Sequence, residues 1–420
     1  IINGNNAGKA TIFERTGLRE WSPVAFFRGG DFDDPIGVSH TDWLGWSVDI
    51  EQSTAIAGGI QGRLDNSPIA SGSIRIYERG STGWTEFGEI FPPNISVPGN
   101  DPVREFGAAV DLDSSANFIA VGASNSAIGA VGTGAGFVLE RSGNEWVSTD
   151  ALTPPTVLFG DHIGVSSAVE EGWAAFGASD DDTNGSSSGA VHIYKRSGLG
   201  NWVFHSTVYS PNPHASARFG NALEISRSDL GLTMVVGSLF EQEGTTNSVG
   251  AGHIFVLDKL NDQWNPTQRL LPEFLTTSAL YGKDVSIDHN TIAVGAPSLR
   301  DSDVGPSVWT GGVEMYNLDQ LSGQFIRRTT IRPEQNQWGS PNGWGNAIGL
   351  SGGTVFLGTS LADGDPYDFA NNNLNYGAVT AHDIICVPDC PADLNGDGVL
   401  NFFDVSAFLN AFSLQDPGAD

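Results

Sequence analysis

One stretch near the C-terminus combines residue types and a spacing that can bind a metal ion. It runs Asp393-Leu-Asn-Gly-Asp-Gly-Val-Leu-Asn-Phe-Phe-Asp404. Residues able to offer oxygen ligands occupy positions 1, 3, 5, 7, 9 and 12, and glycine occupies position 6, which is the spacing of a calcium-binding loop. The sequence therefore predicts a Ca²⁺ site formed by the side chains of Asp393, Asn395, Asp397, Asn401 and Asp404 and the backbone carbonyl of Val399.

The residues after this loop predict a short helix with one apolar face, because Val405, Phe408, Leu409 and Phe412 recur at helical spacing. A calcium loop with Asp at position 12 that leads into one helix resembles the first half of a type I dockerin. Residues 393–420 as a whole resemble the tails of dockerin-anchored surface proteins of planctomycete-type bacteria. This resemblance implies an EF-hand-like attachment or sorting module, recognised by a cohesin-like protein or by sorting machinery.

Residues 386–392 form the expected linker before this module, and they contain both cysteines of the chain, Cys386 and Cys390. A four-residue step can close a disulfide only in a tight turn. The alternatives are a bond from one of them to another residue, or a metal pair that needs two further ligands. The sequence favours disulfide bonding of at least one cysteine, as in exported proteins.

Residues 1–385 contain an internal repeat. A large apolar residue is followed by glycine six times, at intervals of 62, 53, 60, 62 and 63 residues: Leu44-Gly45, Phe106-Gly107, Phe159-Gly160, Phe219-Gly220, Tyr281-Gly282 and Trp344-Gly345. A near-constant period indicates that each repeat is one supersecondary unit. Each unit continues with a small apolar strand, an alternating strand and an aromatic strand, and four strands per repeat predict the blades of a β-propeller.

The unit from Tyr281-Gly282 to Gly295-Ala296-Pro297 resembles the FG-GAP propellers, the family that includes the head of integrin α-subunits. In this numbering Gly8 to Arg15 matches a third strand, so third strands outnumber aromatic-Gly strands by seven to six. We therefore expect an all-β fold, a seven-bladed propeller with four-stranded blades and an incomplete first blade. A missing upstream segment would supply its other strands. The alternative is a six-bladed ring with a loose N-terminal hairpin.

The composition limits the partners of the chain. Asp and Glu number 49 against 20 Lys and Arg, a net charge of −29 that disfavours nucleic acids and anionic membranes. The sequence contains no run of 18 apolar residues, which is the length that would predict a transmembrane helix. We expect a secreted or cell-surface protein. Glycans or proteins are the expected ligands of the propeller loops, and assembly into homo-oligomers or a surface layer stays open.

The sequence assigns no catalytic residue. The His residues are scattered, with His192 and His253 in third strands, and only two of the predicted inner strands carry charge directly after their glycine. Asp111 and Asp113 are the best remnant of a calcium loop within the propeller, whereas the acidic loop 179–185 is typical of a solvated turn. We therefore expect a non-enzymatic binding, adhesion or structural protein. The alternative is an extracellular hydrolase or lyase with its site at the central channel.

Overall fold

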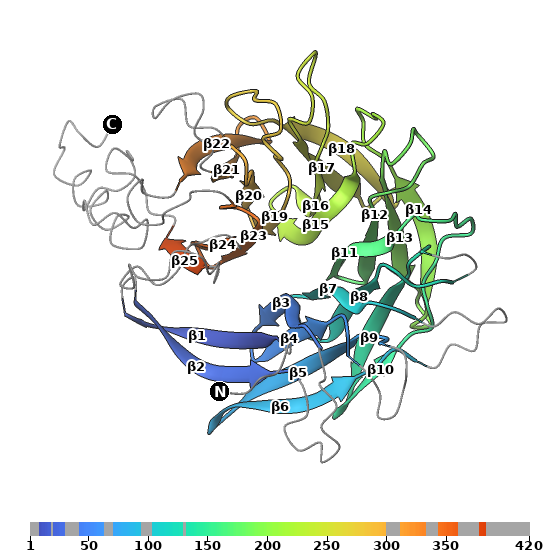
Figure 1. Cartoon of the computed structure of the whole chain (residues 1–420), viewed down its shortest axis with the longest axis vertical. Helices are drawn as coiled ribbons and strands as arrows, with labels where there is room; N and C mark the ends of the chain where they lie inside the picture. Colours follow the sequence, from blue (N-terminus) through green and yellow to red (C-terminus); the bar gives the residue numbers. More distant parts are fainter. Residues whose placement is uncertain are drawn as a thin grey trace.

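The structure is a computed structural model, and it describes residues 8–17, 20–29, 42–62, 70–93, 103–128, 132–299, 311–332, 343–359 and 378–383. These residues form an all-β propeller with six blades arranged around a central axis (Figure 1). Five blades are four-stranded antiparallel sheets and the last is three-stranded, and an additional two-stranded sheet lies beside the first blade. No helix that could cross a bilayer occurs in these ranges.

The two-stranded sheet consists of β1 (Lys9–Gly17) and β2 (Glu20–Arg28). In chain order the six blades are β3 (Leu44–Glu51), β4 (Thr54–Gly59), β5 (Ser73–Gly80) and β6 (Gly83–Ile90); β7 (Phe106–Leu112), β8 (Phe118–Ala123), β9 (Gly136–Ser142) and β10 (Glu145–Ser148); β11 (Ile163–Glu170), β12 (Trp173–Ala178), β13 (Ala190–Arg196) and β14 (Trp202–Val208); β15 (Phe219–Ser228), β16 (Gly231–Ser238), β17 (Ala251–Asp258) and β18 (Gln263–Leu270); β19 (Val285–Asp288), β20 (Thr291–Gly295), β21 (Val313–Asp319) and β22 (Gln324–Ile331); β23 (Ala347–Ser351), β24 (Thr354–Thr359) and β25 (Ala378–Asp383).

The repeated apolar residue before glycine links neighbouring blades. Phe106 forms a parallel bridge with Gly72, which directly precedes the third strand of the blade before it, and the same contact recurs around the ring. Gly72 has a positive φ, and a Cβ there would lie 2.2 Å from the carbonyl oxygen of Phe106. Only glycine allows this approach of two backbones. The repeat is therefore a signature of packing between blades.

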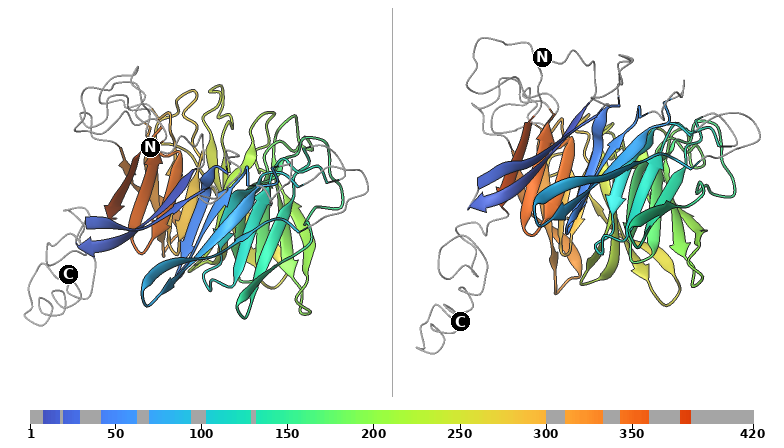
Figure 2. Two further views of the ribbon diagram at one scale, coloured as in Figure 1. Left: turned by 60° about the horizontal axis from the view of Figure 1, so that its bottom comes forward. Right: turned by 90° about the horizontal axis from the view of Figure 1, so that it is seen from below.

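Apolar side chains fill the spaces between adjacent blades. In one such cluster Ile56, Ile74 and Ile76 from one blade pack with Phe106 and Phe137 from the next, and all five are at most 2% exposed. Phe106 and Phe137 meet edge to face, with ring centroids 5.2 Å apart. Packing of this kind between neighbouring blades positions the inner strands, which are the first strands of the blades. Figure 2 shows the blades from the side.

The repeat prediction is wrong for the third unit. Ile163, and not Phe159, forms the parallel bridge to the preceding blade, and Gly164 has the positive φ that follows it. Phe159 is 75% exposed. Phe159-Gly160 matches the repeat pattern four residues before its true position at Ile163-Gly164. This is why the predicted interval from Phe106 to this unit is short.

The prediction of seven blades is also wrong, because the described residues form six. The prediction counted residues 8–15 as the third strand of an incomplete first blade, and in the described part of the chain β1 pairs only with β2. The six-bladed alternative agrees with the structure, although its hairpin is not loose: Ile12 packs with Leu44 and Tyr77. The predicted linker 386–392 and helical module 393–420 lie outside the described residues.

Candidate functional site

Four carboxylates on or directly before the inner strands link neighbouring inner strands at four positions around the ring. Each accepts a hydrogen bond from a backbone N–H of the following inner strand, and we name this set the inner-strand carboxylates. The pairs are Asp49 Oδ2 with Leu112 N at 2.6 Å, Asp111 Oδ2 with Val169 N at 2.6 Å, Glu224 Oε2 with Ile287 N at 2.9 Å and Asp284 Oδ2 with Ile348 N at 2.7 Å.

Burial raises the pKa of every member of this set, and the backbone hydrogen bonds only partly oppose it. The pKa of Glu224 rises to about 8, and those of Asp49 and Asp284 rise to about 6. The pKa of Asp111 also rises, because burial is reinforced by the nearby charges of Asp49 and Glu224. Neighbouring like charges add to the effect of burial at Asp111 and Glu224.

A second set lies further along the same strands, and we name it the strand-end carboxylates: Glu51, Asp113, Glu170 and Asp288. Burial, together with the charges of Asp49 and of the other three members of this set, raises the pKa of Glu51 to about 7. These groups belong to the first, second, third and fifth blades. Carboxylates far apart in the sequence thus converge at one end of the inner strands.

A cavity of about 420 Å³ opens where two of the strand-end carboxylates meet. Asp113, Ser114, Glu170, Glu171 and Arg196 contribute to its lining. Glu170 is 6% exposed and accepts hydrogen bonds from Ser114 N at 2.9 Å and Ser114 Oγ at 2.7 Å. Burial raises the pKa of Glu170 despite these two hydrogen bonds.

This arrangement can perform proton-transfer chemistry. A carboxyl group whose pKa is raised by burial, as that of Glu170 is, is suited to donate a proton to a substrate. The Asp113 carboxylate is held by backbone N–H groups, at 2.8 Å from Asn117 N and 2.7 Å from Phe118 N. Glu170 and Asp113 therefore form two oriented carboxyl groups on one cavity, which is a basis for general acid and general base catalysis.

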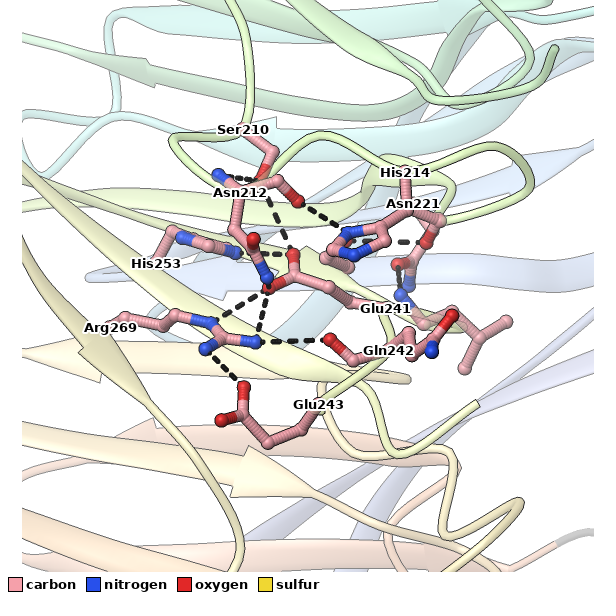
Figure 3. A network of polar contacts seen from close by, with 12 residues as sticks. Ser210, Asn212, His214, Asn221, Glu241, Gln242, Glu243, His253 and Arg269 are labelled. Carbon is pink, nitrogen blue, oxygen red and sulfur yellow. Dashed lines mark hydrogen bonds and ion pairs between the residues drawn. The ribbon is translucent and has the colours of Figure 1, made fainter. Parts of the chain in front are cut away.

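A different kind of carboxylate occupies the loop between β16 and β17 (Figure 3). Glu241 has no exposed surface and accepts hydrogen bonds from His253 Nε2 at 2.8 Å, Arg269 Nε at 2.7 Å, Asn212 Nδ2 at 3.0 Å and Ser210 Oγ at 3.2 Å. Burial alone would raise the pKa of Glu241, but these donors lower it to about 2. Because His253 of β17 and Arg269 of β18 keep Glu241 ionised inside the blade, we assign this network to packing between strands.

The preceding blade contains a shorter counterpart of this network. Asp181 occupies the loop position of Glu241, and His192 occupies the strand position of His253. His192 Nδ1 lies 3.0 Å from Thr207 Oγ1, but Nε2 has no hydrogen-bond partner among the described residues. Burial lowers the pKa of His192 to about 4. Asp181 is 5% exposed, so the prediction that its loop is a solvated turn is wrong at this residue.

The predicted calcium ligands, Asp393, Asn395, Asp397, Val399, Asn401 and Asp404, lie outside the described residues. Within the described ranges, no group of three or more His, Cys, Asp or Glu side chains has the geometry to hold a metal ion. Asp111 and Asp113, considered above as remnants of a calcium loop, instead accept backbone hydrogen bonds.

The sequence pointed to Asp111 and Asp113 only as a calcium-loop remnant, and it did not reveal that acidic residues of several blades lie together. The relevant acids stand four and six residues after the glycine in the first two blades, at Asp49 and Glu51 and at Asp111 and Asp113. In the third blade the repeat was assigned to Gly160, so the sequence did not indicate Glu170, which is six residues after Gly164. A search for acidic residues at these offsets would have found most of both sets.

Comparison with known proteins gives only distant similarities. No family model matches the sequence, and no curated protein matches it. One similar solved structure is a protein described as a 6-phosphogluconolactonase of Bacteroides uniformis, at 11% identity, covering 79% of this chain and 82% of that one with a TM-score of 0.47. Another is the periplasmic gluconolactonase PpgL of Pseudomonas aeruginosa, at 13% identity, covering 89% and 95% of the two chains with a TM-score of 0.47.

Both of these proteins are named as enzymes, whereas the sequence led us to expect a non-enzymatic binding, adhesion or structural protein. That expectation is replaced below by a proposal that rests on the carboxyl groups of this chain. The similarity identifies no substrate and no site for this chain, since the identity is low and function depends on the site and not on the fold. Neither comparison supports the FG-GAP or dockerin resemblance in particular. Any proposal about the chemistry of this chain therefore depends on its own carboxyl groups.

Proposed function

We propose that this protein is an exported enzyme of the hydrolase or lyase type, with its site at the acidic end of the inner strands. The observation that carries the proposal is the cavity of about 420 Å³ that brings Glu170, whose pKa is raised, beside the hydrogen-bonded Asp113. Perturbed carboxyl groups that gather on a cavity are typical of catalytic sites.

In this proposal Glu170 is the general acid and Asp113 is the general base. Ser114 orients Glu170 through two hydrogen bonds, one from its backbone N–H and one from its hydroxyl. Arg196, at the wall of the cavity, is held by Glu140, with Nη2 and Oε1 2.5 Å apart. These contacts place both carboxyl groups on well-ordered strands, which is what proton transfer in a fixed geometry requires.

The charge around the cavity indicates the class of substrate. Glu51, Asp288 and Glu171 add negative charge near Glu170 and Asp113, and the whole chain has a net charge of −29. Like-charge repulsion disfavours phosphorylated or carboxylated substrates. We therefore propose an uncharged substrate with an ester, lactone or glycosidic bond, such as a neutral glycan.

A substrate screen with matched variants tests this function. Neutral glycans, esters and lactones are incubated with the full chain, with Glu170→Gln and with Glu145→Gln, an exposed acid on β10 that serves as control. Removal of a general acid typically costs about 10²–10⁴-fold in rate. We expect turnover by the wild type, loss of that order in Glu170→Gln and no change in Glu145→Gln. Absence of turnover throughout, or equal rates in both variants, contradicts the proposal.

We also propose that residues 393–404 bind Ca²⁺ and that residues 393–420 attach or sort the exported protein through a protein partner. The proposal is supported by the ligand types and their spacing. Calcium is expected to protect this segment from limited proteolysis, and a chelator is expected to abolish the protection. Asp397→Ala should behave like the chelated protein. Equal cleavage with and without calcium contradicts this proposal but leaves the catalytic proposal unaffected.

A further inference from the structure

A second group of charged side chains lies at the starts of the inner strands, at the opposite end from the cavity. In the first five blades, the residue directly before the parallel bridge between blades has a left-handed backbone, with φ between 54° and 58°. These residues are Trp43, Glu105, His162, Arg218 and Leu280. Such a conformation is uncommon for residues other than glycine. Three consecutive blades thus contribute an acid, an imidazole and a guanidinium at equivalent positions.

The inner strands separate this group from the carboxylates of the proposed catalytic site. Glu105 directly precedes β7 and Asp113 directly follows it, while His162 directly precedes β11 and Glu170 is its last residue. A strand of 7 residues is about 20 Å long, at about 3.3 Å per residue. This length exceeds the distance of about 8 Å over which exposed charges interact in physiological salt. Ligand binding at this end therefore does not depend on the proposed catalytic activity.

Asp180 holds His162 and Arg218 close to each other. His162 Nδ1 donates a hydrogen bond to Asp180 Oδ2 at 3.0 Å, and Arg218 Nε lies 3.6 Å from Asp180 Oδ1. The guanidinium of Arg218 also lies over the ring of Phe240, 5.6 Å from its centroid. One carboxylate thus orients two basic side chains that come from neighbouring blades.

The other nitrogens of both side chains have no hydrogen-bond partner in the part of the chain that the structure describes. The side chains of His162 and Arg218 are 40% and 46% exposed. Beside His162 Nε2 lies Gly132, where an added Cβ would be 3.7 Å away, so no side chain fills this place. The preceding residues 129–131 are Gly, Ala and Val, without an acidic group. These observations favour an added ligand over an acid of the adjoining chain as the partner of both donors.

The charge of this group favours a negatively charged ligand. The hydrogen bond to Asp180 raises the pKa of His162, and the charges of Asp180 and Glu105 act in the same direction, against burial and the charge of Arg218. Protonated His162 donates to Asp180 through Nδ1 and presents Nε2–H as a second donor. Two cations therefore share one anion and retain donors for another.

We propose that His162 Nε2 and the terminal nitrogens of Arg218 together bind the carboxylate group of a ligand. Hydrogen bonds between a cationic donor and a carboxylate are short and strong, and the planar guanidinium matches both oxygens of a carboxylate. Asp180 is a positioning residue, which keeps both donors oriented.

Nearby acids determine the charge of the ligand. Glu105, which accepts a hydrogen bond from Ser124 Oγ at 2.7 Å, acts on His162 through its charge, and the buried Asp161 also interacts electrostatically with His162. A doubly charged anion such as sulfate is repelled by these acids more strongly than a singly charged carboxylate. The two ends of the ring thus differ, because the acidic end disfavours carboxylates and this end binds one.

Calorimetric titration of the full chain with galacturonate, acetate, galactose and sulfate tests this site. At about pH 6 His162 is mostly protonated, because its pKa is raised above the ordinary value of about 6.5. We expect both carboxylates to bind, sulfate to bind more weakly than galacturonate, and galactose, which lacks the carboxylate, not to bind.

Two variants and a matched control locate the binding. His162→Asn removes Nε2 but keeps an amide N–H for Asp180, and asparagine tolerates the left-handed backbone. Arg218→Gln removes the other cation. Each is expected to weaken galacturonate binding by about tenfold or more, because a charge-assisted hydrogen bond is lost. His289→Asn should bind as the wild type does. His289 also has a left-handed backbone, with φ of 52°, and lies 2.5 Å from Asp288, but at the other end of the ring.

The pH dependence separates ligand binding from a structural role. Above its pKa, His162 keeps Nδ1–H bonded to Asp180, so Nε2 carries a lone pair that repels a carboxylate. The affinity for galacturonate should fall by about tenfold or more from about pH 6 to about pH 9, and His162→Asn should abolish this dependence. Binding should also shift the Nε2 signal of His162, but not that of His289, in ¹⁵N NMR spectra of the histidine rings.

The proposal is overturned if neither carboxylate moves the His162 signal, if galactose binds as galacturonate does, or if either His162→Asn or Arg218→Gln binds galacturonate as tightly as the wild type. Tighter binding of sulfate than of galacturonate overturns the assigned class of ligand. If one variant fails to fold, the other variant and the NMR signal still decide. The turnover assay with Glu170→Gln is independent of these results, so the two proposals fail separately.

Discussion

Glu224 on β15 and Glu241 in the loop after β16 belong to the same blade, yet their pKa values shift in opposite directions. The pKa of Glu224 rises to about 8 and that of Glu241 falls to about 2. Glu241 accepts hydrogen bonds from Arg269 and His253. Glu224 receives a backbone N–H and faces the like charges of Asp49 and Asp284.

The difference shows how one fold separates structural from reactive carboxylates. Burial disfavours the charged form in both places, and the neighbours decide the outcome. The hydrogen-bond donors around Glu241 stabilise its ionised carboxylate, and two of them, His253 and Arg269, lie on the adjacent strands β17 and β18. Burial, reinforced by neighbouring like charges at Glu51, Asp111 and Glu224, raises the pKa values of the inner-strand carboxylates and of Glu51. Only the second arrangement leaves groups able to exchange a proton with a substrate.

The largest expected effect comes from removing the paired charge. Glu241→Gln leaves Arg269 with one fewer anionic partner and His253 without a carboxylate acceptor. Breaking one partner of a buried ion pair typically costs about 3–5 kcal/mol. Urea unfolding should show a loss of that order at pH 7. The matched variant Glu243→Gln, which breaks the partly exposed pair with Arg269, should cost about 1 kcal/mol or less. Equal losses of unfolding free energy in both variants would contradict the distinction between the buried and the partly exposed ion pair.

The opposite sign is expected for Glu224→Gln, which keeps the shape of the side chain and removes its charge. A group whose pKa is raised on folding contributes stability that is fully present below its unfolded pKa of about 4.3. That contribution is lost as the pH rises through about 8. We therefore expect the variant to be more stable than the wild type by about 1–3 kcal/mol at pH 9. This gain is smaller than the full pKa shift implies, because the carboxylate keeps some contact with water in the folded state.

At pH 4 the two proteins should have closely similar free energies of unfolding, since Glu224 is then protonated in the folded state. Glu145→Gln, at an exposed position on β10, serves as the control and should show no such pH dependence. A Glu224→Gln protein that is less stable than the wild type at pH 9 would contradict the assigned crowding of like charges.

The smallest effect is expected from converting the shorter network into the longer one. Asp181→Glu adds one methylene and brings a carboxylate toward the unpartnered Nε2 of His192, as Glu241 reaches His253. The gain is limited to about 0.5–1.5 kcal/mol, because the bond from Thr183 N to Asp181 is exchanged for the new one. In an NMR titration the pKa of His192 should rise from about 4. An unchanged pKa shows that the longer side chain does not reach the ring.

The sequence was sufficient for the propeller and for its four-stranded unit, because glycine and apolar periodicity directly encode contacts between blades. It misplaced one unit, since Phe159-Gly160 imitates the pattern that Ile163-Gly164 fulfils in space. It could not distinguish six blades from seven, because β1 has the pattern of a third strand without the sheet that normally surrounds it.

The candidate site was less predictable for a physical reason. Asp49, Glu170 and Glu224 belong to blades separated by more than 50 residues, and their pKa values depend on mutual distance and on burial. Neither quantity is written in a local motif. Asp111 and Asp113 illustrate the problem, because their spacing alone was equally compatible with a weak calcium loop.

The central claim, that carboxyl groups at the inner strands keep protons at neutral pH while Glu241 does not, is tested most directly by infrared spectroscopy. Spectra in D₂O are compared for the wild type, Glu224→Gln and Glu243→Gln between pH 5 and pH 9. The account predicts a protonated-carboxyl band at pH 7 that is weaker in Glu224→Gln, unchanged in Glu243→Gln and lost as the pH rises through about 8. The absence of any protonated-carboxyl band in the wild type at pH 7 would contradict it.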